Sequence, residues 1–127
     1  MKGNGDVGLG WLKRAESDFA AAEVLANNAT ALEGVCFHCQ QAAEKSLKGW
    51  LIAHDVRAPK THMLKDLIKL CAQKQSRFEE LLSDANALTP YATKLRYAAD
   101  FWPSMDQART ALEQARRIYD FVKAHWS

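Results

Sequence analysis

The helical spacing of apolar residues in the middle of the chain constrains the fold most strongly. Between residues 32 and 50, apolar side chains recur every three or four positions. At about 100° per residue they fall on one stripe of an α-helix, so this segment is predicted to be a helix with one buried face. We expect it to run from about Ala31 to His54 or Asp55. The residues on the stripe are Leu32, Cys36, Cys39, Ala43, Leu47 and Trp50.

Four further segments show the same spacing, and no segment alternates with a period of two. They comprise residues 12–28, a shorter segment after residue 61, residues 76–90 and a last segment from residue 104. Amphipathic helices joined by short connections pack into bundles. The predicted fold class is therefore all-α, an antiparallel up-and-down bundle of four long helices plus a short fifth helix.

Three places have the sequence of a capping box, in which two side chains satisfy backbone N–H groups at the start of a helix. They are Thr30–Glu33, Ser76–Glu79 and Ser104–Gln107. Thr61 is a further capping candidate, at the start of the shorter helix. Between Lys94 and Pro103 the helical spacing is lost, and this aromatic-rich stretch is predicted to be a loop that docks on the bundle.

Length and composition bound the class of protein. A chain of 127 residues forms one domain, which we place at residues 11–127; residues 1–10 hold four of the six glycines and are predicted to be a flexible tail. No apolar run approaches the roughly 20 residues of a membrane span and no signal-peptide pattern is present, so the expected location is cytoplasmic. The odd number of cysteines, three, argues against a closed disulfide framework.

The balance of charges bears on the class of partner. The net charge is +2 and 25% of the residues are charged. A dedicated electrostatic nucleic-acid binder usually carries a strongly basic stripe. RNA is therefore not the favoured partner, although this overall charge is compatible with local basic patches.

The helix predicted over residues 31–55 also carries a polar face. Its members fall within roughly 80° of one another, opposite the apolar stripe. They are His38, Gln41, Lys45 and Lys48. Lysines offer charge-assisted hydrogen bonds to a phosphate, and His and Gln offer directional bonds to a base. The alternatives to a binding site are a solvated helix face and a surface for a partner helix.

Two residues elsewhere could extend this site. His62 either lies in the first turn of the helix that Thr61 caps, or meets the Lys48 end of the polar face. Arg96, in the aromatic loop, either supplies a cation to a ligand or pins the loop to the bundle.

The sequence contains no clear metal or catalytic motif. Cys36 and Cys39 have the spacing of half a metal site, but both lie on the apolar stripe and no second ligand pair follows, so they are predicted to be core thiols. We expect no metal, and no cofactor other than a bound nucleotide. No Ser or Cys has a base at motif spacing, and no glycine-rich phosphate loop follows Trp11. Nothing requires an enzyme; Arg57 and His62 are the remaining candidates for catalysis.

Four motifs together resemble the HEPN domain, from about Trp11 to Trp126. They are Cys36–Lys48, Pro59–Leu64, Leu95–Tyr97 with Asp100–Phe101, and Ala115–Val122. The resemblance implies a helical bundle that pairs as a homodimer, binds a nucleotide and works beside a small nucleotidyltransferase, in systems of the toxin–antitoxin kind. The candidate nucleotide-binding residues are then His38, Gln41, Lys45, Lys48, His62 and Arg96.

Many proteins of this family are ribonuclease toxins, whose cutting motif is an Arg followed four to six residues later by a His near the start of a late helix. Here Arg96 has no such His, and the pair with this spacing, Arg57 and His62, lies in the loop after the second helix. We therefore expect no efficient RNA cleavage. A metal-independent HEPN ribonuclease is the first alternative function, and a purely structural dimeric interaction module is the second.

Overall fold

The computed structural model of the chain describes residues 3–93 and 102–127. Five α-helices and two short 3-10 helices account for most of this part of the chain, and it contains no strand, so the predicted all-α class is confirmed. No helix in it is long and apolar enough to cross a bilayer. The elements in order are α1 (Asn4–Leu25), α2 (Leu32–Ala53), α3 (Leu64–Lys74), η1 (Ser76–Leu81), α4 (Leu82–Leu88), η2 (Thr89–Ala92) and α6 (Met105–Ala124).

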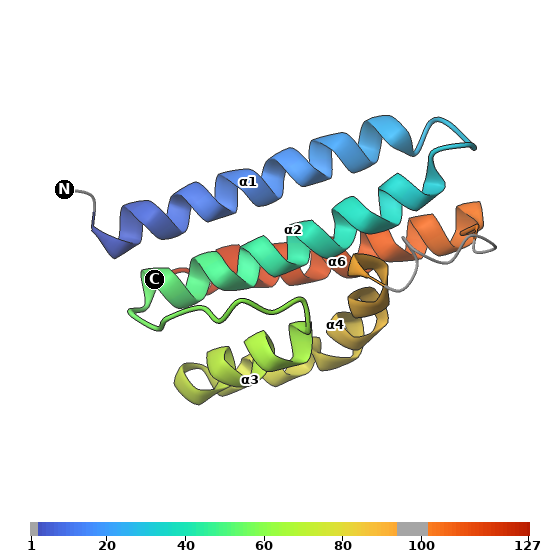
Figure 1. Ribbon diagram of the computed structural model, residues 1–127. Helices are drawn as coiled ribbons and strands as arrows, with labels where there is room; N and C mark the ends of the chain where they lie inside the picture. The colour runs from blue at the N-terminus through green and yellow to red at the C-terminus, as the bar shows by residue number, and fades with distance from the viewer. Residues whose placement is uncertain (1–2, 94–101) are drawn as a thin grey trace.

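Helix α2 is the central element of the bundle. α1 packs along one side of it, α6 along another, and α3 with α4 covers a third (Figure 1). Of the 22 residues of α2, 13 are buried, whereas 6 of the 22 in α1 are buried. The predicted apolar stripe is confirmed, since all six of its residues are in the core. Because neighbours surround α2, its polar residues are also partly enclosed.

The connection between α2 and α3 runs back along α2. It begins at the end of α2, yet His62 near its end contacts Glu44, about ten residues before that end. Consequently α3 runs in the same direction as α2, and Lys74 in its last turn donates to the backbone oxygen of His54 at 2.7 Å. A chain of ten extended residues spans at most about 35 Å, which is ample for this return. We call residues 54–63 the return loop.

Helix α1 begins at Asn4, so the predicted start at Leu12 is wrong, and the helix takes in part of the segment predicted to be a flexible tail. The reason is a close approach of two helices. A Cβ atom on Gly8 would lie 2.6 Å from the backbone oxygen of Gly49, and one on Gly49 would lie 2.8 Å from that of Gly8. Gly8 therefore allows α1 to pack closely against α2. This packing outweighs the low helix propensity of glycine.

Of the three predicted capping boxes, the Ser104–Gln107 box at the start of α6 is formed, with hydrogen bonds of 3.0 and 2.8 Å. The other two predictions are wrong. Helix α2 has Ala31 as its N-cap, and the Thr30 hydroxyl bonds to Asn28 instead. The N-cap of η1 is Gln75, whose side-chain oxygen accepts from the backbone N–H of Arg77 at 3.5 Å.

The predicted cap at Thr61 is displaced in a similar way. The N-cap of α3 is Met63, and the Thr61 hydroxyl accepts from its backbone N–H at 3.0 Å. His62 therefore lies in the return loop and not in the first turn of α3. Of the predicted aromatic loop, Trp102 and Pro103 belong to the described residues, and the Trp102 side chain is exposed rather than docked.

Candidate functional site

The predicted polar face of α2 is largely engaged with other parts of the protein. His38 Nδ1 lies 2.8 Å from Asp18 Oδ1, and Lys45 Nζ donates to Asp18 Oδ2 at 2.8 Å. Asp18 comes from α1 and is buried. We call His38, Lys45 and Asp18 the Asp18 cluster. It joins α1 to α2 through a charged contact inside the helix interface.

A second cluster surrounds Glu44, which is 5% exposed. Its carboxylate contacts His62 Nδ1 at 2.8 Å, Lys48 Nζ at 3.0 Å and Gln40 Nε2 at 3.1 Å. Burial alone would raise the pKa of the Glu44 carboxyl, but the hydrogen bonds from His62, Gln40 and Lys48 outweigh burial and lower the pKa below its ordinary value. Glu44 is therefore ionised at neutral pH. These four residues form the Glu44 cluster.

Gln41 extends the Glu44 cluster by one step. Its amide nitrogen donates to Gln40 Oε1 at 2.8 Å, and Gln40 Nε2 donates both to Glu44 and, at 3.3 Å, to the backbone oxygen of His62. Gln40 is fully buried. This chain of amides ties the return loop to the middle of α2.

These contacts exclude the interpretation of the polar face as an ordinary solvated helix face. The side chains of His38, Lys45 and Lys48 are 30, 24 and 12% exposed. α1 covers one flank of the face and the return loop covers the other. The structure brings His62 to the Lys48 end of the face, as one of the two alternatives expected. Arg96 lies outside the described residues.

Three residues that complete the clusters were not among the predicted site residues: Asp18, Gln40 and Glu44. The spacing of Gln40, Glu44 and Lys48 at intervals of four was a usable signal, because such residues are neighbours on a helix. Nothing in the sequence indicated Asp18, which lies on another helix. A buried acid between a lysine and a histidine is visible only once α1 and α2 are packed together.

The imidazole of His62 is held in one orientation. An ionised carboxylate can only accept hydrogen bonds, so Nδ1 of His62 carries the hydrogen that is donated to Glu44. In the neutral imidazole, Nε2 is then left as an acceptor. Because the side chain is 58% exposed, Nε2 is available to a ligand or to a proton.

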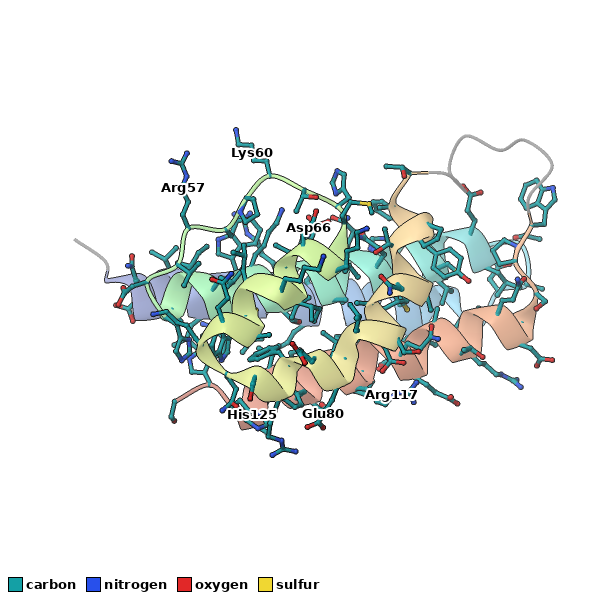
Figure 2. The ribbon with its side chains drawn as sticks, turned by 90° about the horizontal axis from the view of Figure 1, so that it is seen from below. Arg57, Lys60, Asp66, Glu80, Arg117 and His125 are labelled. Carbon is teal, nitrogen blue, oxygen red and sulfur yellow. The ribbon has the colours of Figure 1, made fainter. Side chains whose placement is uncertain are left out.

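A groove of about 550 Å³ lies beside the Glu44 cluster, between the first half of α1 and the return loop. Its polar lining includes Lys48, Arg57 and Lys60, and its apolar lining includes Trp11 and Pro59. Figure 2 shows Arg57 and Lys60 projecting from the return loop away from the helices. Lys48 belongs to both the groove and the Glu44 cluster, so the two form one continuous site.

The groove is positively charged. Three cations line it, and Asp55 is the one carboxylate among its lining residues. Asp55 also accepts a hydrogen bond from Asn4 Nδ2 at 2.7 Å, which fixes the first turn of α1 at the edge of the groove. Such a lining, with cations beside an aromatic ring and a proline, suits a ligand that carries both anionic and flat apolar parts.

The cysteines belong to the core, as predicted. All three are free and buried. Burial raises the pKa of the Cys36 thiol to about 11 and that of Cys39 to about 12, so neither is a thiolate at neutral pH. In the described part of the chain, no three His, Cys, Asp or Glu side chains are grouped so as to hold a metal ion.

The HEPN domain family model matches residues 9–125. The chain belongs to the HEPN family. Among solved structures, this HEPN chain is similar to ST0689, an archaeal HEPN homologue, with 25% identity, a TM-score of 0.77 and full coverage of both chains. It also shares the fold of TT1696 from Thermus thermophilus, with 24% identity, a TM-score of 0.76, and 92% of this chain and 96% of the other covered. A search of curated proteins gave no significant match.

Proposed function

We propose that this HEPN protein binds a nucleotide, with its phosphates in the groove and its remainder beside His62. The observation that carries the proposal is the position of Glu44. One oxygen of this buried carboxylate holds His62 and the other holds Lys48, which lines the groove. A site for anions and an oriented imidazole are thus joined through a single side chain.

The chemistry of the lining favours a nucleotide over a simple anion. Lys48, Arg57 and Lys60 supply charge-assisted hydrogen bonds of the kind that phosphates accept. The Arg14 guanidinium lies over the Trp11 ring, 5.4 Å from its centroid, and a base can stack on the opposite face. Such stacking works for every base because each has a π-face. Both parts line the same groove, so one ligand can reach both.

The predicted nucleotide-binding residues divide into two groups under this proposal. Lys48 and His62 contact the ligand at the groove end of the site. His38 and Lys45 contribute mainly to positioning α1 and α2, since both are bonded to Asp18. Gln41 supports the Glu44 cluster through Gln40. Arg96 remains a predicted contact.

Thermal unfolding with ATP and GTP tests the proposal. A ligand at 100 times its dissociation constant stabilises the folded state by about 2.7 kcal/mol, which gives a clear rise in melting temperature. Lys60→Glu should abolish the rise because it reverses one charge of the groove. Lys69→Glu is the matched control, since Lys69 is exposed on α3 and is not a groove residue. If ATP or GTP raises the melting temperature of both variants equally, the groove is not the binding site.

The protein is also proposed to act as a homodimer beside a small nucleotidyltransferase, which is the partner that the family resemblance implies. Light scattering at micromolar concentration should then report about twice the chain mass of 14.2 kDa. Mass spectrometry of proteins that co-purify from native cells should identify a nucleotidyltransferase. A strict monomer without this partner would contradict both statements.

RNA cleavage is the second candidate function, and the oriented His62 favours it. An imidazole is well placed for general acid–base catalysis when one nitrogen is held by a partner and the other can reach the substrate. His62 satisfies both conditions, and Arg57 lies in the same loop as a cation for the phosphate. Single-stranded RNA incubated with wild type, His62→Ala and Arg57→Ala distinguishes the candidates. Cleavage lost in both variants would establish a ribonuclease.

A further inference from the structure

Asp55 has an unusual backbone conformation for its residue type. Its φ angle is 62°, and it is the one residue other than glycine with a positive φ in the described part of the chain. It follows α2 in a Schellman arrangement, with the N–H of Val56 bonded to Leu51 O at 2.8 Å and its own N–H bonded to Ile52 O at 3.1 Å. Glycine is the usual residue at this position because it adopts positive φ without strain.

Asp55 is among the residues that line the groove, so a glycine here would relieve the backbone but remove the single carboxylate of the lining. Strained positions tend to persist where the side chain has a function. The bond from Asn4 engages Oδ1, whereas Oδ2 has no hydrogen-bond partner among the described residues. Asp55 therefore presents a free acceptor to whatever occupies the groove.

We propose that Asp55 selects ribonucleotides by accepting a hydrogen bond from the ribose 2′-hydroxyl. This inference rests on the proposed nucleotide site. A carboxylate repels phosphates, so among the parts of a nucleotide it favours hydrogen-bond donors. The cations and Trp11 contact parts that every nucleotide has, phosphate and base. The 2′-hydroxyl is the donor that ribonucleotides have and deoxyribonucleotides lack, whatever the base.

The experiment compares the dissociation constants of ATP and 2′-deoxyATP by calorimetry. A hydrogen bond to a charged group is worth about tenfold or more in affinity, so wild type should bind ATP about tenfold more tightly. A ten-nucleotide RNA and the DNA of the same sequence form a second pair, which separates a free nucleotide from an RNA chain as the source of the ribose. A preference in either pair supports the inference.

Asp55→Gly should lose the preference while the protein remains folded, with an unchanged or higher melting temperature because the backbone strain is relieved. Asp66→Asn is the charge control, since it removes an exposed carboxylate on α3 outside the groove, and it should keep the preference. If wild type binds both members of each pair equally, or if Asp55→Gly keeps the preference, the inference is wrong and the nucleotide site stands. If wild type binds none of the four ligands, the nucleotide site itself is wrong.

Discussion

Glu44 Oε1 lies 2.8 Å from His62 Nδ1, although the two residues belong to different elements and are 18 positions apart. The contact exists because the return loop runs back along α2 and brings its end to the middle of that helix. It fixes which nitrogen of His62 faces solvent. It also separates two roles, since the buried carboxylate positions the imidazole and the imidazole itself stays exposed to solvent.

The first prediction concerns stability and pH. The folded-state pKa of Glu44 is lowered from 4.5, so its ionised form stabilises the fold. This contribution is complete above about pH 4.5 and is lost as the pH falls through the folded-state pKa. Glu44→Gln should therefore reduce the free energy of unfolding by about 2 kcal/mol at pH 7, as expected when a buried carboxylate loses its charge-assisted hydrogen bonds.

Urea denaturation at pH 7 and in steps below pH 4.5 measures this effect. The difference between wild type and Glu44→Gln should shrink as the pH falls. The control is Glu80→Gln, because Glu80 pairs with Arg77 on the surface, where both side chains are more than half exposed. A difference that is constant with pH would show that Glu44 does not act as a carboxylate.

The second prediction concerns the glycines of α1. Gly8→Ala should destabilise the protein by about 1–3 kcal/mol, because its Cβ would overlap the backbone of Gly49 and force the two helices apart. Gly10→Ala in the same helix meets nothing within 4 Å and should stabilise it by about 0.5–1 kcal/mol. Chemical denaturation checks that the first variant is less stable, and the second more stable, than wild type. Equal effects would contradict the close approach of α1 and α2.

The third prediction concerns thiol reactivity. The native protein at pH 8 should react slowly with a thiol reagent, since burial keeps Cys36 and Cys39 protonated and closed to solvent. Cys71 is buried as well, and burial raises its pKa further. All three thiols should react once the protein is denatured. Rapid labelling of the native protein would indicate that α2 opens or that its stripe is not the core.

The core of the bundle was predictable from the sequence because helical periodicity is a local property. The stripe from Leu32 to Trp50 needs no knowledge of the rest of the chain to be identified. The start of α1 was not predictable by the same reasoning, because Gly8 is helical on account of Gly49 on another helix. The predicted cap at Thr30 failed for a local reason, since its hydroxyl bonds to Asn28, two residues earlier, instead of the helix that follows.

The candidate site was predictable only in part. His38, Gln41, Lys45 and Lys48 share a helix face, and that much follows from their spacing. Gln41 and Lys48 have hydrogen-bond partners on the same helix, Gln40 and Glu44. Asp18, in contrast, reaches His38 and Lys45 because α1 packs on α2, and the groove exists because the return loop reverses direction. No local pattern specifies either event.

The most direct test of the nucleotide site is a titration of ¹⁵N-labelled protein with ATP, monitored through its tryptophan indole signals. Trp11 lines the groove, whereas Trp50 is 2% exposed and donates its indole N–H to the His125 backbone oxygen at 2.8 Å. The Trp11 signal should move with saturable dependence on ATP while the Trp50 signal stays in place. A saturable change that leaves Trp11 unmoved, or the absence of any change at millimolar ATP, would contradict the proposed site.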